Sequence, residues 1–195
     1  MPPMTRGLLI ANVAVFFLAQ YAGLFDVSAF ALWPLGSGRF MPWQLVSYAF
    51  LHGSITHLAF NMFGLWMFGS ELERVWGSRR LGIFFAISVL VAAFAQLIIT
   101  AWLGSINPTI GASGGLFGLL IGFAMVFPTR RIVLLIPPIP LPAPLFVAIY
   151  GAIELTLGVT GSVSGVAHFA HLGGLLGGWL TIRYWRGQMP FGRRR

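Results

Sequence analysis

Residues 81–129 form a run of 49 residues that contains no Asp, Glu, Lys or Arg. A helix needs only about 20 apolar residues to cross the roughly 30 Å hydrocarbon core of a bilayer. The whole chain of 195 residues is 57% hydrophobic and only 8% charged, which lies outside the usual composition of soluble domains. The sequence therefore predicts an integral membrane protein.

The uncharged runs divide into six expected spans. The run 81–129 is long enough for two spans, and the glycines and proline of "GSINPTIGAS" (104–113) break it. The run 132–182 divides in the same way at "GVTGSVSG" (158–165). We therefore predict an all-α fold, a bundle of six transmembrane helices in a single domain over residues 1–195. The expected spans are 7–25, 45–70, 81–103, 113–127, 145–160 and 166–182.

Two segments need a separate interpretation. Arg6 followed by an apolar run is similar to a signal peptide, but nineteen uncharged residues (7–25) suffice to cross the membrane and no Ala-x-Ala site follows. We interpret this run as the first span. "PPIPLPAP" (137–144) has five prolines in eight positions and cannot be a continuous helix. It is expected to be an extended lead into the fifth span.

The twelve basic residues are all arginines, and they predict the orientation of the chain. A net charge of +8 would suggest a nucleic-acid partner in a soluble protein, but here the arginines lie at the edges of apolar runs. With Arg6 on the cytoplasmic side, eleven of the twelve follow the positive-inside rule, and Arg39 is the exception. We expect a multi-pass protein of the cell membrane, the bacterial inner membrane, with both termini cytoplasmic and no nucleic-acid partner.

Seven polar side chains stand out within the apolar runs: His52, His57, Asn61, Ser113, Glu154, His168 and His171. Polar groups in a bilayer are costly and are usually functional or paired. Ser113 alone is explained by close helix packing, because Gly114, Gly118 and Gly122 recur on one face beside it. A lone histidine is more often a buried hydrogen-bonding residue. Single residues therefore do not decide the function.

The histidines raise the alternative of a metal site. His168 and His171, three residues apart on one helix, could bind a metal together with His52 and His57. The chain has no cysteine, so no thiolate can contribute, and no carboxylate clearly joins these histidines in the sequence. We therefore expect no metal site and no other cofactor.

Depth in the membrane favours a catalytic interpretation. A helix from Ser113 to Phe127 rises about 22 Å, less than the core of about 30 Å, so its N-terminus must lie below the outer surface. At about 1.5 Å per residue outward from the inner arginines, His57 and His171 reach a similar height. Asn61 lies one turn below His57 on the same helix face. Four polar groups on three spans therefore share one layer in the outer half of the membrane.

Helix faces then select one histidine as the partner of Ser113. His171 points toward the side of Gly174 and Gly178, whereas His168 points away from Gly178. The small faces of the fourth and sixth spans can approach closely, which would bring Ser113 to His171. A serine beside a histidine base is the minimal nucleophile pair. The free N–H groups at a helix N-terminus can stabilise an oxyanion.

At this point the chain resembles the rhomboid family of intramembrane serine proteases, over all six expected spans. The matching motifs are "HGSITHLAFN" (52–61), "ELERVWGS" (71–78), "GASG" (111–114) and "AHLGGLLGG" (170–178). The resemblance implies a Ser–His dyad in which Ser113 is the nucleophile and His171 the general base. It also implies an oxyanion hole formed by the side chains of His57 and Asn61 and by the backbone of Ser113. The implied substrates are transmembrane segments of other proteins, locally unwound, with a small residue before the cut.

The chain departs from the family pattern at two positions. Trp43-Gln44 stands where many members have Trp-Arg, which affects a contact that anchors the first loop. Phe117 stands where some members have tyrosine, so it can stack on the base but cannot donate a hydrogen bond. A Ser–His dyad has no carboxylate as a third member, so the resemblance assigns no role to Glu154. An interhelical hydrogen bond is its favoured role, and a role in orienting His171 is the alternative.

Two rival functions remain beside proteolysis. A catalytically silent relative would bind or escort membrane proteins without cleaving them, but such relatives typically lack the serine or the histidine. A transporter or proton channel would use His57 and His171 as a relay, yet it should carry ionisable groups through both halves of the membrane. The sequence leaves the oligomeric state open.

Overall fold

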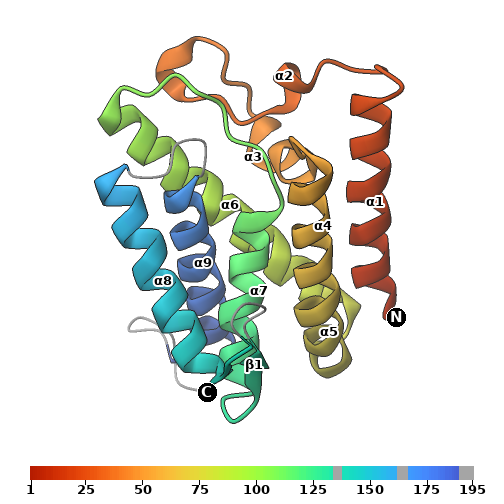
Figure 1. Ribbon diagram of the computed structural model, residues 1–195, viewed down its shortest axis with the longest axis vertical. Helices are drawn as coiled ribbons and strands as arrows, with labels where there is room; N and C mark the ends of the chain where they lie inside the picture. Colours follow the sequence, from red (N-terminus) through yellow and green to blue (C-terminus); the bar gives the residue numbers. More distant parts are fainter. Residues whose placement is uncertain (134–137, 162–166, 189–195) are drawn as a thin grey trace.

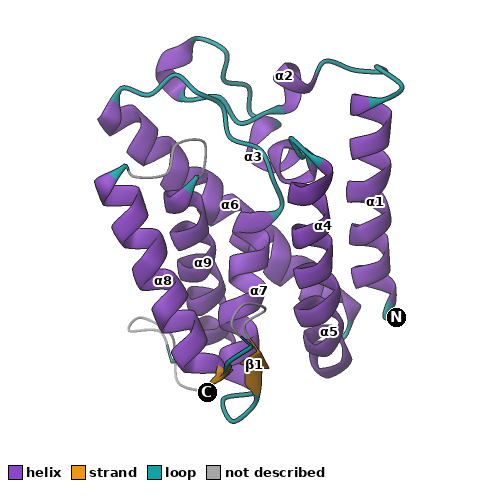
Figure 2. Cartoon of the chain, in the orientation of Figure 1, coloured by secondary structure: helices purple, strands orange, loops and turns teal. Residues whose placement is uncertain are grey.

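The structure is a computed structural model that describes residues 1–133, 138–161 and 167–188 (Figure 1). Most of these residues are helical, with one small antiparallel hairpin that the all-α prediction did not include (Figure 2). Short 3₁₀ turns add Leu35–Ser37 and Tyr48–Phe50. The helices are α1 (Pro3–Gln20), α2 (Val27–Phe30), α3 (Gln44–Ser47), α4 (Ile55–Gly64), α5 (Ser70–Trp76), α6 (Ser78–Leu103), α7 (Ser113–Val126), α8 (Ala143–Thr160) and α9 (His168–Trp185), and the strands are β1 (Arg131–Val133) and β2 (Pro140–Pro142).

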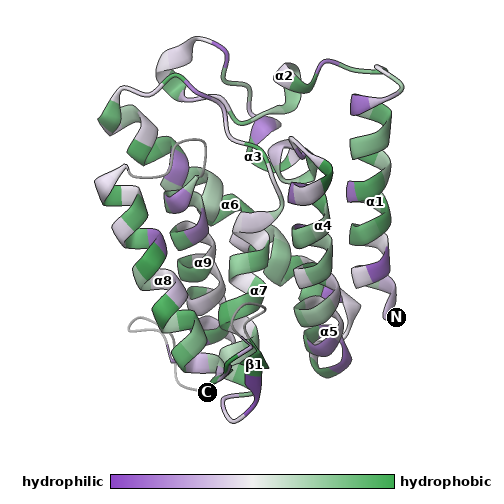
Figure 3. Ribbon diagram, in the orientation of Figure 1, coloured by the Kyte–Doolittle hydropathy of each residue, from purple (hydrophilic) through white to green (hydrophobic). Residues whose placement is uncertain are grey.

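The apolar helices identify a multi-pass membrane protein. By length and composition, α1, α6 and α8 can each cross a membrane, and α7 is a shorter apolar helix. Hydrophobic residues dominate these helices, although hydrophilic residues interrupt α8 and α9 (Figure 3). Large apolar side chains also face outward, such as Ile98 and Trp102 on α6, which are 67% and 82% exposed. A lipid environment accounts for such exposure.

Helix α7 lies inside the bundle, where it contacts both α6 and α9 (Figure 1). A Cβ at Gly174 would collide with the backbone of Gly114, and one at Gly178 would lie 2.8 Å from the carbonyl oxygen of Gly118. The glycine faces of α7 and α9 therefore meet, as the sequence predicted. Glycine permits this approach because only the absence of a Cβ lets the two backbones come so close.

The second expected span, 45–70, is wrong at its beginning. Residues 44–50 form two short turns, and the long helix starts only at Ile55. Ser54 caps it, because its Oγ accepts a hydrogen bond from the backbone N–H of His57 at 3.1 Å. The helix then passes through a π-helical turn, Leu65–Gly69, and continues as α5 to Trp76. Counting uncharged residues could not detect this boundary, since a serine cap carries no charge.

The other expected spans differ less from the helices. α1 begins at Pro3 and ends at Gln20 instead of covering 7–25, since proline is well suited to the first helical position. The proline-rich stretch is extended at β2, as expected, and its residue 137 is not described. Also outside the described residues are 162–166, with the expected start of the last span, and the C-terminal arginines.

Gln44 anchors the first loop. It is 1% exposed, and its Nε2 donates to the carbonyl oxygens of Ala29 and Arg39 at 3.2 and 3.1 Å. Its Oε1 accepts from the backbone N–H groups of Trp33 and Met41, each at 3.2 Å. Many members of the family that the chain resembles have an arginine at this position. In this chain Gln44 holds the first loop through these four hydrogen bonds.

Glu73 on α5 acts as a cap for the N-terminus of α1. Its two carboxylate oxygens accept hydrogen bonds from the backbone N–H groups of Met4 and Thr5 at 2.8 and 2.7 Å. The hydroxyls of Thr5 and Ser78 add two more, at 2.7 and 2.6 Å. A helix N-terminus favours a negative charge. Burial alone would raise the pKa of Glu73, but these hydrogen bonds outweigh burial and hold the pKa below its ordinary value of 4.5.

We expect Glu73→Gln to destabilise the fold by about 1–3 kcal/mol, because an amide puts a donor where the carboxylate accepts. A lowered pKa stabilises the fold above the unfolded pKa, and this contribution is lost as the pH falls through the folded value. Thermal unfolding in detergent should therefore show a wild-type midpoint that falls below about pH 4.5. The variant should show a lower midpoint at pH 7 and a smaller fall in acid. Equal midpoints at pH 7 would contradict this role.

Candidate active site

The loop before α7 presents Ser113 as the first residue of that helix. Gly111 has a φ of +126°, a conformation that favours glycine. Its N–H donates to the carbonyl oxygen of Tyr48 at 2.9 Å, and Leu32 and Thr109 exchange two backbone hydrogen bonds of 2.9 Å. The first loop thus holds the segment that leads into Ser113. Because Ser113 begins the helix, the first N–H groups of α7 have no carbonyl on a preceding turn.

Ser113 and His171 lie in hydrogen-bond contact. The Nε2 atom of His171 is 2.8 Å from the Oγ atom of Ser113. The ring of Phe117, one turn along α7, is stacked on the His171 ring with centroids 4.3 Å apart and planes 5° apart. The stacked ring limits the tilt of the imidazole. The structure therefore brings together the two residues that the sequence analysis paired, and Phe117 makes the expected stacking contact.

His57 and Asn61 lie on one face of α4, beside the start of α7. A Cβ at Gly111 would be 2.8 Å from the Nε2 atom of His57 and 3.7 Å from the Oγ atom of Ser113. The imidazole of His57 therefore packs against Gly111 next to the serine. Asn61 is 4% exposed, and its Nδ2 has no hydrogen-bond partner among the residues that the structure describes. It is a buried donor available to a group bound at this place.

His52 packs against the ring of His57. The two rings meet edge to face, with centroids 4.9 Å apart. His52 is 2% exposed, so its ring is buried beside that of His57. The ring of His52 pairs with that of His57, whereas the ring of His168 lies 6.5 Å from that of His171.

Glu154 of α8 joins two histidines of α9. Its Oε2 atom lies 2.6 Å from the Nδ1 atom of His168 and 3.0 Å from the Nδ1 atom of His171. The sequence alone shows no carboxylate that clearly joins these histidines, whereas the structure places Glu154 beside both of them. The sequence analysis did consider both a hydrogen bond between helices and contact with His171, and the structure contains both.

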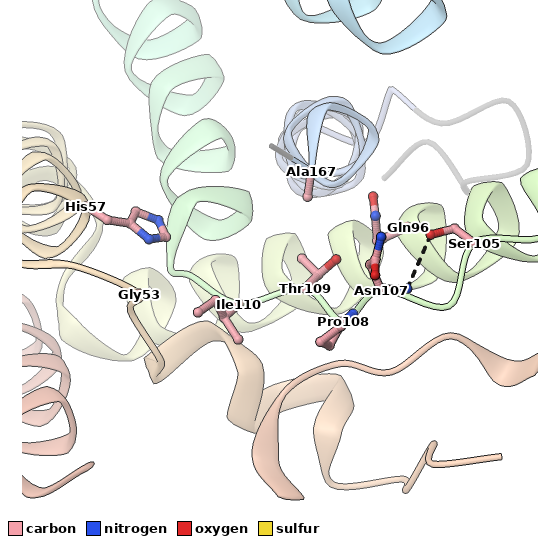
Figure 4. Close-up of a pocket in the computed structure, with 9 residues that line it drawn as sticks. All are labelled: Gly53, His57, Gln96, Ser105, Asn107, Pro108, Thr109, Ile110 and Ala167. Atoms are coloured by element: carbon pink, nitrogen blue, oxygen red, sulfur yellow. Dashed lines mark hydrogen bonds between the residues drawn. The ribbon is translucent and has the colours of Figure 1, made fainter. Parts of the chain in front are cut away.

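A cavity of about 350 Å³ opens beside His57 (Figure 4). It is lined by Gly53, His57, Gln96, Ser105, Asn107, Pro108, Thr109, Ile110 and Ala167. The lining includes the loop that leads into α7 and the residue before α9, so the cavity borders the elements that carry Ser113 and His171. Gln96 lines this cavity and was not among the predicted site residues, although a lone amide in an otherwise apolar span was a usable signal.

The arrangement can support acyl transfer. A hydroxyl in contact with an imidazole provides a nucleophile and a base. The first N–H groups of α7, the His57 ring beside Gly111 and the Asn61 amide, which is unpaired within the described chain, are the candidate donors to an oxyanion. The cavity is lined by His57 and by Thr109 and Ile110 of the loop that leads to Ser113.

A family model described as the rhomboid domain matches residues 39–187. The chain is also similar to bacterial proteins named rhomboid protease GlpG. It is 27% identical to the protein of Pectobacterium atrosepticum over 184 residues, which cover 94% of this chain and 62% of that protein. It is 27% identical over 185 residues to the protein of Serratia proteamaculans, with the same two coverages. For the protein of Photorhabdus laumondii the identity is 25% over 190 residues, covering 97% of this chain and 63% of that protein. The chain thus spans less than two thirds of these relatives' length.

Proposed function

Because the chain belongs to the rhomboid family, we propose that it is an intramembrane serine endopeptidase that cleaves transmembrane segments of other membrane proteins. The observation that carries the proposal is the 2.8 Å contact between Ser113 Oγ and His171 Nε2 at the N-terminus of α7. The names of the relatives support the same activity.

In the proposed reaction, Ser113 Oγ attacks the scissile carbonyl carbon while Nε2 of His171 takes the hydroxyl proton. Collapse of the tetrahedral intermediate breaks the C–N bond, and His171 returns the proton to the leaving amine. Water from the cavity beside His57 then attacks the acyl-enzyme, with His171 again acting as base. A substrate helix must unwind locally, because a helix hides its carbonyl groups. Sequences that weaken a helix, with a small residue before the cut, fit this requirement.

We also propose that α1, the segment from Ile55 to Ser70, α6, α7, α8 and α9 are six membrane crossings of a single domain, with Glu73 beyond the inner end of the second crossing. The N-terminal turn of α1 and the C-terminal turn of α9 lie at the same end of the bundle (Figure 1). Contacts of α5 with Thr5 and with Trp185 support this arrangement. The arginines near this end support a cytoplasmic side under the positive-inside rule, and the bacterial relatives support the inner membrane of a bacterium.

The oxyanion hole allows a separate prediction. We expect His57→Ala and Asn61→Ala each to lower turnover by about 100- to 1000-fold, because each removes a donor that stabilises the charged intermediate. KM should change little. The double variant should lose less than the product of the two single losses, since both side chains serve one charge. Cleavage rates at saturating substrate in liposomes measure this, with thermal unfolding followed in parallel.

His52→Phe is the control, because it alters a neighbouring histidine and keeps a ring packed against His57. It should retain far more turnover than His57→Ala. Wild-type rates in both the His57 and Asn61 variants would mean that these residues are structural. The same conclusion would follow if they lost activity only because they unfolded.

The proposed activity is tested by incubating the purified chain in liposomes with a membrane protein whose transmembrane segment contains glycine or proline. Two fragments cut within or next to that segment are the expected result. Binding of the substrate without fragments, across a panel of such segments, would favour the catalytically silent alternative. Ion or proton flux in the same liposomes would favour a transporter.

A further inference from the structure

Glu154 is buried in a helix that otherwise exposes most of its surface. Its described buried residues are Ala143, Val147 and Glu154, and Glu154 is 7% exposed. A carboxylate inside a membrane protein is costly unless it is paired or neutral. The burial of this single acid on α8 therefore calls for specific partners.

Both partners lie on α9, one turn apart. The Oε2 atom of Glu154 is 2.6 Å from Nδ1 of His168, which is a short hydrogen bond. The same oxygen is 3.0 Å from Nδ1 of His171. That second pair is within hydrogen-bond distance but is not well aligned, so Nδ1 of His171 has no hydrogen bond within the described part of the chain. Contacts of this kind often tighten only when substrate binds.

The two nitrogens of His171 thus face two different groups. Nε2 is 2.8 Å from Ser113 Oγ, and Nδ1 is 3.0 Å from Glu154 Oε2. A neutral imidazole carries its proton on one nitrogen only. A carboxylate beside Nδ1 favours the proton there, which leaves the lone pair of Nε2 directed at the serine.

A metal ion is the other occupant that these side chains suggest, since ligand atoms of Glu154, His168 and His171 all lie within 4.8 Å of one another. Ligands about 2.0–2.1 Å from a tetrahedral zinc ion lie roughly 3.3 Å apart. The observed separations of 2.6 and 3.0 Å from one oxygen are shorter than this and fit shared protons better. The cluster is therefore better explained as a hydrogen-bonded group.

We propose that Glu154 is a positioning residue for His171, so that the site works as a serine–histidine–carboxylate chain rather than as a dyad. The inference rests on the proposed protease function. Glu154 accepts the Nδ1–H of His171 and stabilises the imidazolium that forms when Nε2 takes the serine proton. The carboxylate itself stays ionised. His168 holds the same oxygen from the other side and keeps Glu154 in place.

The first test compares Glu154→Gln with Thr156→Val, a matched change at an exposed position of the same helix. Glu154→Gln should lower kcat by about 100-fold, as loss of a group that assists proton transfer does, while KM stays within about twofold. Thr156→Val should cleave like the wild type. A wild-type kcat in a folded Glu154→Gln variant would overturn the proposal.

The second test measures the tautomer of His171 directly. The measurement is made on the wild-type protein, so it does not depend on whether a Glu154 variant folds. In protein labelled with ¹⁵N-histidine, the His171 ring, assigned by its loss in His171→Ala, should carry its proton on Nδ1 at neutral pH. A neutral His171 with its proton on Nε2 in the wild-type protein would overturn the proposal. If the wild type cleaves no substrate, the proposed function fails, whereas this measurement still decides the contact with Glu154.

A chelator distinguishes the metal alternative. Cleavage by the wild type should be the same with and without EDTA. Loss of cleavage that added zinc restores would make Glu154, His168 and His171 a metal site and would overturn the positioning role.

Discussion

Replacing Ser113 by alanine is expected to reduce cleavage to background, a loss of roughly 10⁴-fold or more, because nothing else at this position can form the acyl-enzyme. The Oγ atom of Ser113 lies 2.8 Å from Nε2 of His171. The alanine side chain fits where Ser113 fits, so the fold should be retained. The measurement is fragment release in liposomes, followed to long times. Labelling of the wild type by a fluorophosphonate, absent from the variant, gives a second readout that does not depend on the choice of substrate.

Ser28→Ala is a suitable control, because Ser28 is an exposed serine of the first loop and lies outside the proposed site. It should cleave at the wild-type rate. Cleavage by Ser113→Ala at a rate close to wild type would remove Ser113 as the nucleophile. If the wild type also bound substrate without cutting it, this protein would be a catalytically silent member of the rhomboid family.

Much of the candidate site could be predicted because helix geometry links sequence spacing to direction. The start of α7 at Ser113 follows from the glycines and proline before it and from the position of the inner arginines. The close approach of α7 and α9 follows from glycines repeated on one face of each. These arguments use only periodicity, rise per residue and the absence of a Cβ.

Other features depend on contacts that no periodicity encodes. α8 is apolar on nearly all sides, so its sequence does not determine which face meets α9, and the contact of Glu154 with His171 could be raised only as an alternative. The start of α4 depends on the cap at Ser54. The cavity beside His57 depends on how the loop 105–110 crosses α6, and loop paths have no repeating pattern.

His171→Ala is expected to have an effect nearly as large as Ser113→Ala. Without the imidazole, the serine proton has no acceptor at 2.8 Å, and a hydroxyl is a poor nucleophile while it keeps its proton. We expect a loss of turnover of roughly 10⁴-fold, similar to the loss on removing a base from other serine–histidine sites. Combining it with Ser113→Ala should add little, because the two residues act as one unit. Labelling by the fluorophosphonate should also be lost, although Ser113 is present.

His168→Ala is the matched control for this change, since it removes a histidine one turn away on the same helix. His168 contacts Glu154 and has no contact with Ser113 among the described interactions, so its loss should slow cleavage by less than about tenfold. The contrast separates direct proton transfer from support of the carboxylate, because both variants leave a cavity beside Glu154. If His168→Ala abolished cleavage and His171→Ala retained it, the base would be assigned to the wrong residue. The side of α9 that packs against α7 would then have to be explained by something other than the pairing of Ser113 with His171.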